Sequence, residues 1–423
     1  MQSNPKGKIM LMNEEQLQEM SKTERKKYLY KLKLIRNIFD FGPQSNAELF
    51  TLLGISSPTS LALLSELQEE NILEKKGKGA SIGGRKPELF GLKDDTYYIL
   101  SIDVERFKVR MAVLDNNCNY ITGPVKHDIT ITPDLKSLDS LFEAIELLIK
   151  SAIFDHRKLI GIGMSMPGLV DSRAGKNYTY LIPGPEDNLQ ELMQRKLGYP
   201  VFIQNDVKSA TIAECRYGLA YGKSDALLVL MDWGIGLGII MDGKLRSGSK
   251  GFSGEIGHIP FVEDGKLCYC GKRGCLETVA SGIALARMAK EGIQSGKSSI
   301  LNQLSDQEIE TIEPRIIIDA ANKGDQYAIN ILSEVGVSLG RGIATLIQLF
   351  NPEVIILGGK IAAAKQYITI PILHSVNTYS MTAIRENTKV ILSELGNDAG
   401  ILGTVSMVID KVLEMQIEMA GKS

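Results

Sequence analysis

The segments GEIGH at residues 254–258 and CYCGKRGCLE at residues 268–277 say most about the fold and chemistry of this chain. They contain one of the four histidines and three of the five cysteines, namely His258, Cys268, Cys270 and Cys275. Three thiolates and one imidazole form a complete tetrahedral ligand set for Zn²⁺. Free cysteines that pack as small apolar side chains are the alternative. The spacing and the flanking glycines favour zinc, because glycine lets the backbone turn tightly enough to bring the sulfurs together.

These segments resemble the signature of the ROK family, which comprises repressors, open reading frames and sugar kinases. The resemblance extends upstream to GIGMSMPGLVD at 161–171 and to Asn205-Asp206. Downstream it includes NPEVIILGG at 351–359 and LGNDAG at 395–400. The motifs cover most of the chain from about residue 95 onward. The resemblance implies an α/β fold with a two-lobed, actin-like (ribonuclease H-like) body.

The composition is typical of a globular protein. A chain of 423 residues is too long for one ordinary core, so two or three domains are expected. The sequence has no apolar run of membrane-spanning length and no signal-peptide pattern at its start, so no membrane partner is expected. Three of the five cysteines fall in one metal-like cluster, which indicates a reducing compartment and predicts a cytoplasmic protein.

The N-terminal part differs in charge from the rest of the chain. Residues 21–93 carry thirteen Lys and Arg against eight Asp and Glu, a net charge of +5, whereas the whole chain carries −2. A basic module on an acidic body suggests contact with nucleic acid. A solvated helical face would explain the same charges.

A helix-turn-helix pattern lies within this module. Apolar residues at helical spacing predict a first helix over residues 28–41. Ser45 and Glu48 form a capping box, which predicts a second helix reaching about Leu53. A short turn containing Gly54 separates it from a third helix, an arrangement typical of DNA-binding helix pairs.

The third helix is the expected recognition helix. Ser57 followed by Pro58 predicts its N-cap and its first helical position. We expect Ser57, Thr59, Ser60 and Ser65 to face DNA. The helix has no Arg or Lys, so bidentate contacts to guanine are not available to it. Affinity would then depend on phosphate contacts from the wing and from basic residues of the first helix.

Two strand-like pieces flank a glycine-rich basic loop after this helix. The segment GGRKP at 83–87 resembles the wing of ROK repressors, which implies that Arg85 and Lys86 contact DNA. The module is therefore predicted to be a winged helix-turn-helix domain over residues 20–93. A helical protein-interaction module with a flexible linker is the alternative.

Both phosphate-binding loops of the ROK kinases are altered in this chain. The first reads Asp-x-Gly-Gly-Thr in the kinases and DVERF at 103–107 here. The second reads Gly-Thr-Gly-x-Gly in the kinases, whereas DWGIGLG at 232–238 begins with an acid and an indole. Glu105 would place a carboxylate beside the phosphates, which repels them. Catalysis that depends on ATP is therefore not expected.

The sugar side is better preserved. The resemblance implies that a sugar would be bound by Asn205, Asp206, Glu255, His258 and Glu277. The family places its catalytic base at Asp206, but a carboxylate accepts a hydrogen bond from a sugar hydroxyl whether or not a phosphoryl group is transferred. Asp206 would be catalytic only if the chain were a kinase. For the two glutamates, support of the metal or a solvated surface is the alternative.

The sequence thus predicts a sugar-responsive transcription regulator, most simply a repressor of carbohydrate-utilisation genes. Its expected partners are a duplex DNA operator, a monosaccharide or sugar derivative, and further copies of itself in a homodimer or homotetramer. The expected domains are the winged module at 20–93, a first lobe at 95–205 to which residues 400–423 return, and a second lobe at 206–399 with the zinc loop. A ROK sugar kinase with a DNA-binding appendage and a zinc-stabilised scaffold are the alternatives.

Overall fold

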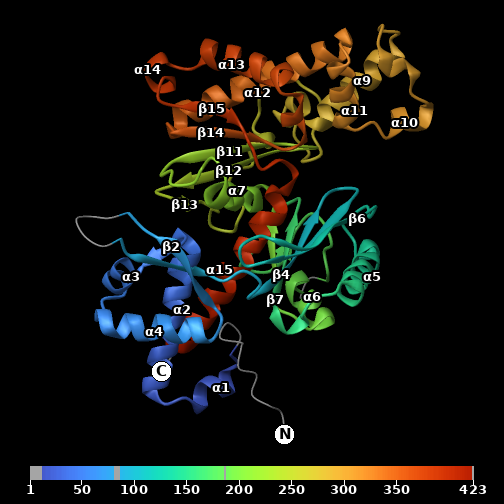
Figure 1. Cartoon of the computed structure of the whole chain (residues 1–423). Coiled ribbons are helices and arrows are strands. Elements are labelled where there is room, and N and C mark those ends of the chain that lie inside the picture. Colours follow the sequence, from blue (N-terminus) through green and yellow to red (C-terminus); the bar gives the residue numbers. More distant parts are fainter. Residues whose placement is uncertain (1–11, 81–85, 185–186, 422–423) are drawn as a thin grey trace. The chain divides into compact units, whose positions relative to one another are not determined.

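The computed structural model describes residues 12–80, 86–184 and 187–421. The chain forms two compact units. The first comprises Met1–Gln204 with Thr404–Ser423, and the second comprises Asn205–Gly403. Each unit contains a mixed five-stranded sheet with helices (Figure 1). The predicted class, α/β with a helical N-terminal module before two sheets, is confirmed.

The first unit begins with the predicted winged helix-turn-helix module. Its helices pack around buried leucines and isoleucines of the second and fourth helices. A three-stranded sheet in the order β1-β3-β2 completes it. The elements are α1 (Glu14–Glu19), α2 (Lys22–Phe41), β1 (Gln44–Ser45), α3 (Asn46–Leu53), α4 (Ser57–Glu69), β2 (Leu73–Lys78) and β3 (Glu88–Leu92).

Serine N-caps determine where α2, α3 and α4 begin. The capping box of Ser45 and Glu48 is present and starts α3 as predicted. Helix α2 starts at Lys22 rather than at residue 28, because Ser21 and Glu24 form a further capping box. The N-cap of α4 is Ser56, one residue before the predicted Ser57.

The first lobe follows within the same unit. Its sheet has the order β10-β7-β4-β5-β6, with β4 parallel to β7 and antiparallel to β5. Apolar side chains of this sheet and of α5 form the core. The elements are β4 (Tyr98–Val104), β5 (Val109–Asp115), β6 (Tyr120–His127), α5 (Lys136–Ser151), β7 (Leu159–Met166), α6 (Leu189–Leu197), β10 (Val201–Asn205) and the short pair β8 (Val170–Asp171) and β9 (Lys176–Asn177).

The second unit repeats this strand arrangement. Its sheet has the order β13-β12-β11-β14-β15, with β11 antiparallel to β12 and parallel to β14. The strands are β11 (Ala226–Met231), β12 (Ile235–Met241), β13 (Lys244–Leu245), β14 (Val354–Gly358) and β15 (Lys389–Leu392). The helices are α7 (Asp206–Tyr217), α8 (Glu277–Ala280), α9 (Gly282–Gln294), α10 (Asp306–Glu310), α11 (Pro314–Asn322), α12 (Gln326–Phe350), α13 (Gln366–Tyr379) and α14 (Thr382–Arg385).

The last helix, α15 (Ala399–Gly421), belongs to both units. Residues up to Gly403 belong to the second unit and the rest to the first. Within the first unit, α15 packs directly on β7 at Gly163. A Cβ atom built at Gly163 would lie 2.8 Å from the side chain of Val408, so this close approach requires glycine.

The far end of α15 holds the winged module. Tyr28 is buried and donates a hydrogen bond of 2.6 Å to the amide oxygen of Gln416. The same amide group contacts both the backbone N–H and the carbonyl of Met12. Arg25 donates to the carbonyl oxygens of Met419 and Ala420, which end the helix and have no partner within it. These contacts join residues 12–28 to residues 416–420, two segments far apart in sequence.

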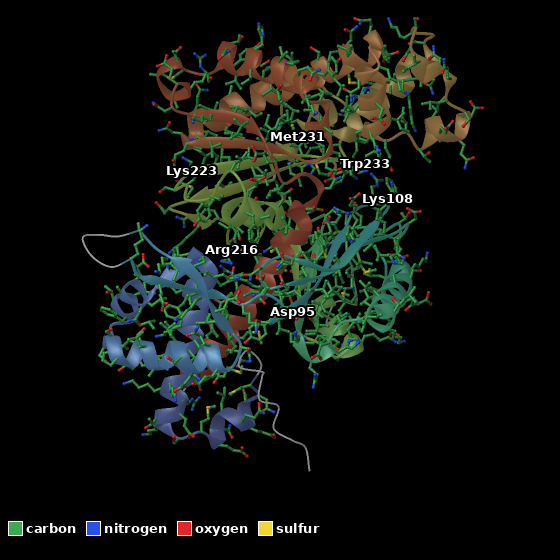
Figure 2. All side chains as sticks on the ribbon, viewed as in Figure 1. Asp95, Lys108, Arg216, Lys223, Met231 and Trp233 are labelled. Atoms are coloured by element: carbon green, nitrogen blue, oxygen red, sulfur yellow. The ribbon has the colours of Figure 1, made fainter. Side chains whose placement is uncertain are left out.

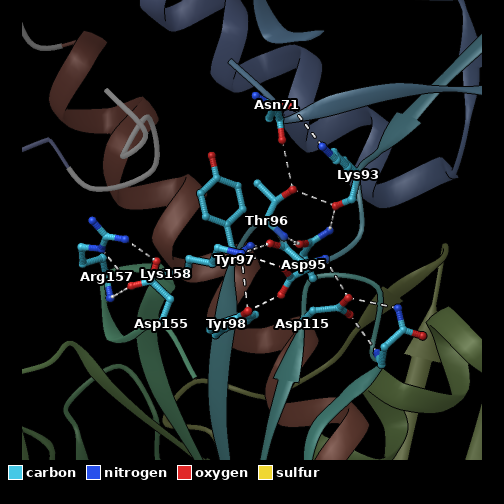
Figure 3. Close-up of polar contacts among 12 residues, drawn as sticks. Asn71, Lys93, Asp95, Thr96, Tyr97, Tyr98, Asp115, Asp155, Arg157 and Lys158 are labelled. Atoms are coloured by element: carbon cyan, nitrogen blue, oxygen red, sulfur yellow. Dashed lines mark hydrogen bonds and ion pairs between the residues drawn. The ribbon is translucent and has the colours of Figure 1, made fainter. Parts of the chain in front are cut away.

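The linker between the module and the first lobe is also held by polar contacts (Figure 3). Thr96 donates from its hydroxyl to the carbonyl of Asn71 in the module. Asp95 accepts from Lys158 at 2.8 Å, and the backbone N–H of Asp95 donates to Asp115. The linker is therefore bonded to both sides within the first unit.

Within the described ranges, no single helix is both long and apolar enough to cross a bilayer. Helices α3 and α4 meet the composition criterion only as a pair bent by 113°.

Candidate functional site

The predicted metal ligands lie together in the second unit. The ligand atoms of His258, Cys268, Cys270 and Cys275 are all within 4.8 Å of one another. Thiolates on one tetrahedral Zn²⁺ lie about 3.8 Å apart, given a Zn–S bond of ~2.3 Å. The Sγ atoms of Cys270 and Cys275 are 3.6 Å apart, and Cys268 Sγ is 3.6 Å from His258 Nδ1. These separations fit a single tetrahedral ion.

The imidazole of His258 uses its two nitrogens differently. Nδ1 faces the sulfurs, whereas Nε2 lies 2.9 Å from the hydroxyl of Tyr269, whose ring meets the imidazole edge to face. A hydrogen bond to the second nitrogen fixes the orientation of a metal-bound histidine. The predicted second role of His258, a contact to sugar, would require Tyr269 to move aside. Tyr269 was not recognised from the sequence.

Asn205 and Asp206 mark the start of α7. Asn205 is buried, and its side chain caps the helix by accepting from the backbone N–H of Lys208. Its amide group donates to Asp206 Oδ1, which also accepts from the N–H of Val207. A carboxylate at a helix N-terminus is stabilised by the unpaired N–H groups there. The pair is thus held in a fixed orientation at the end of β10.

Lys208 is a buried cation beside these residues, and its side chain is only 3% exposed. Its ammonium group donates to the carbonyl of Ser253 at 3.3 Å. Burial lowers the pKa of Lys208, although the charges of Glu255 and Asp206 oppose that shift. The position of Lys208, two residues after Asp206, places it at the edge of the predicted pocket, but its burial was not expected from the sequence.

The two glutamates differ in their surroundings. Glu255 is exposed, and its pKa is raised because the surrounding protein desolvates it more than Lys208 stabilises its charge. Glu277 is buried, and its Oε2 accepts from the backbone N–H of Ile235. Burial raises the pKa of Glu277 to about 7, and the charge of Glu255 adds to this shift. Within the described residues, Glu277 Oε1 has no hydrogen-bond partner.

Electrostatic coupling links four of these residues. Lys208 interacts with Asp206 and Glu255, and Glu255 interacts with Glu277. The structure therefore brings together three predicted sugar ligands and the buried cation Lys208. Carboxylates and an amide at one place can accept and donate hydrogen bonds to several hydroxyl groups.

The altered phosphate loops contain ion pairs within each unit. In the first unit, Asp103 pairs with Arg110 at 3.8 Å. In the second, Asp232 pairs with Lys360 at 3.6 Å, and its side chain accepts from the N–H of Trp233. Met231 ends β11 and Trp233 follows it in the turn before β12, where the indole packs against the core (Figure 2).

The predicted DNA-binding residues of α4 differ in how far they are exposed. Thr59 is exposed, and its hydroxyl lies 2.7 Å from that of Ser56. Ser57 is half-buried and accepts from the side chain of Asn46 across the turn. Ser60 is fully buried, so the expectation that it faces DNA is wrong. It shares the inward face with Leu63, Leu64 and Leu67 at helical spacing.

Phosphate contacts were expected from basic residues of the first helix, but two lysines of α2 form ion pairs within the module itself. Lys27 pairs with Glu66 of α4 at 2.6 Å, and the buried Lys31 pairs with Glu66 and Glu70. In the wing, the N–H of Gly79 donates to the carbonyl of Pro87 and closes the hairpin between β2 and β3. Lys86 is exposed beside it, whereas Arg85 lies outside the described residues.

Comparisons with known proteins agree with this arrangement. The ROK family profile matches residues 99–411. A xylose repressor from Caldicellulosiruptor bescii is 31% identical over 92% of this chain and 97% of its own length. The DNA-binding transcriptional dual regulator NagC from Escherichia coli is 30% identical over 89% of this chain and 91% of its own length.

Solved structures similar to this chain include a transcriptional regulator and a kinase. A ROK family transcriptional regulator, a homologue of the E. coli MLC protein, has a TM-score of 0.75 and 25% identity over 94% of this chain and 99% of its own. A ROK family glucokinase from Streptomyces griseus, with glucose and AMPPNP, has a TM-score of 0.65 and 29% identity over 73% of this chain and 98% of its own. With its profile match, its repressor relatives and its Cys–His cluster, the chain belongs to the ROK family.

Proposed function

We propose that this chain is a sugar-responsive DNA-binding regulator, most simply a cytoplasmic repressor of carbohydrate-utilisation genes. One observation carries the proposal: a winged helix-turn-helix module precedes a ROK body whose sugar-side residues are retained. The names of the relatives, xylose repressor and transcriptional regulator, support it.

The sugar would be bound in the second unit. Asp206 and Glu255 would accept hydrogen bonds from sugar hydroxyls, and Asn205 would hold Asp206 in place. Glu277 and His258 complete the proposed set. Zn²⁺ would be held by His258 and the three cysteines and would fix the loop that follows Glu255.

The DNA would be bound by α4 and the wing. We propose contacts from Ser57, Thr59, Arg85 and Lys86. Ser57 would meet the DNA backbone, because its hydroxyl accepts from Asn46 and still has a hydrogen to donate to a phosphate oxygen. Two modules in a homodimer or homotetramer would bind two half-sites. Replacing Arg85 by alanine should weaken binding by about 1–3 kcal/mol if the guanidinium enters a groove, which fluorescence anisotropy would measure.

The response to sugar is tested by Asp206→Ala. This variant should bind duplex DNA as tightly as the unaltered chain, but sugar should no longer change that binding. Anisotropy titrations with a labelled duplex, selected from a random pool, would be repeated with D-xylose, D-glucose and N-acetyl-D-glucosamine. A variant that responds to the same sugar at the same concentration would place the effector site elsewhere. Joint loss of thermal stability and DNA binding would mean that Asp206 is structural.

The alternative of a sugar kinase is favoured by the likeness to ROK family kinases such as the glucokinase. We propose that the chain does not catalyse phosphoryl transfer, because Asp232 and Trp233 replace the leading Gly and Thr of one loop and Glu105 lies in the other. A coupled assay with ATP and the same sugars should give no turnover above background. Turnover that depends on sugar and disappears in Asp206→Asn would contradict this.

A further inference from the structure

Near the start of α4, the outward face of the helix is apolar. Ser60, Leu63, Leu64 and Leu67 are buried on the inward face. On the opposite face, Leu61 is 46% exposed, and Pro58, Ala62 and Ser65 are exposed beside it. Successive residues turn by about 100° around a helix, so Leu61, Ala62 and Ser65 lie on one side. The Leu61 side chain is not part of the buried core of the module.

The outward face of α4 has no cationic side chain, and its exposed acid, Glu69, lies about two turns beyond Leu61 at the end of the helix. Helix α4 carries no Arg or Lys between Ser57 and Glu69. Its Glu66 is held by Lys27 and Lys31 of α2. The hydroxyls of Ser57 and Thr59 have partners in Asn46 and Ser56. The helix is therefore poorly equipped to read bases through charged hydrogen bonds.

The major groove offers one apolar group to such a face. Thymine presents its C5-methyl group there, and short apolar side chains contact it, whereas guanine is usually read by Arg or Lys. In helix-turn-helix proteins, the N-terminal residues of the recognition helix contact the base edges. Leu61 and Ala62 lie in the first two turns of α4.

We propose that Leu61 and Ala62 recognise thymine C5-methyl groups in the major groove. The half-site facing α4 would then carry thymines at adjacent positions, and specificity would come from apolar contact rather than from guanine readout. This inference rests on the proposed DNA-binding function. It names the bases that the recognition helix selects and the residues that select them.

The test removes the methyl groups one at a time. The full chain would first be used to select duplexes from a random pool. The preferred duplex would then be made with deoxyuridine, which lacks the C5-methyl group, at single thymine positions. Each substitution under α4 should weaken binding about fourfold, the equivalent of the ~0.8 kcal/mol expected for one buried methyl group. The salt dependence should be unchanged, because no phosphate contact is lost.

A double-mutant cycle assigns the contact to Leu61. In Leu61→Ala, replacing thymine by deoxyuridine at the affected position should have no further effect, because the side chain and the methyl group act as a pair. Leu147→Ala serves as the matched control, since Leu147 is 60% exposed on α5, outside the module. That control should keep the full penalty for deoxyuridine. Thermal unfolding would check that both variants fold.

The possible failures are distinguishable. Equal affinity for thymine and deoxyuridine duplexes at every position would overturn the inference but leave DNA binding intact. An equal penalty for deoxyuridine in Leu61→Ala and in the unaltered chain would exclude Leu61 as the reader. If Leu61→Ala did not fold, the deoxyuridine scan with the unaltered chain would still decide whether methyl groups are read. If no duplex were selected, the proposed function itself would fail.

Discussion

Replacing Cys270 by serine should release the metal from the Cys–His cluster and unfold the loop around it. The four ligand atoms of the cluster fit one tetrahedral ion, and a serine hydroxyl is a far weaker ligand than a thiolate. Structural zinc contributes about 10–16 kcal/mol to the folding of small zinc domains at neutral pH, so loss of one ligand has a large effect. Cys270 is exposed, so the substitution removes no core packing.

Metal analysis of freshly purified protein measures this directly. The unaltered chain should contain about one zinc ion per chain, the number that one tetrahedral site holds. Cys270→Ser should contain almost none and should unfold at a lower temperature. Cys118→Ser is the control, since Cys118 lies outside the cluster, and it should retain the metal. A chain that contains no zinc when purified without chelators would refute the assignment.

Replacing Gly403 by alanine should destabilise the second unit strongly. A Cβ atom at Gly403 would lie 1.8 Å from the carbonyl oxygen of Ser209 and 2.4 Å from its carbon. Both atoms belong to the backbone of α7, so a change of rotamer cannot relieve the overlap. Overpacking typically costs about 1–3 kcal/mol, and this contact between two backbones should reach the upper end or exceed it.

Denaturant unfolding would measure the loss. Gly421→Ala is a matched control on the same helix, because a Cβ atom at Gly421 would have no neighbour within 4 Å. That variant should be as stable as the unaltered chain. Because Ser209 follows Asp206 by less than one turn of α7, Gly403→Ala should also weaken the response to sugar. An unchanged free energy of unfolding in Gly403→Ala would show that α7 and α15 can separate without cost.

Much of the site could be predicted because its signals are local. The His258 and cysteine spacing indicated a metal cluster, and the four side chains do converge. The capping box of Ser45 and Glu48 placed the start of α3 correctly, because such a box depends only on residues three apart. The class of the fold followed from the resemblance of several motifs along the chain to those of the ROK family.

The errors came from features that local patterns do not determine. The burial of Ser60 is an exception, because its spacing from Leu63, Leu64 and Leu67 already places it on the inward face of α4. The burial of Lys208 depends on Ser253, 45 residues later in the sequence. The contact between Gly403 and Ser209 spans most of the second unit. Such contacts arise from tertiary packing, which a single sequence does not reveal.

The attachment of the winged module to the end of α15 has a consequence for protein synthesis. The module is synthesised before α15, yet Met12, Arg25 and Tyr28 hydrogen-bond to residues 416–420 of that helix. A nascent chain can therefore form the helix-turn-helix before it can anchor it. The contacts to Gln416, Met419 and Ala420 form only after both units have been translated, so a chain that stops before α15 would hold the module through the linker contacts alone.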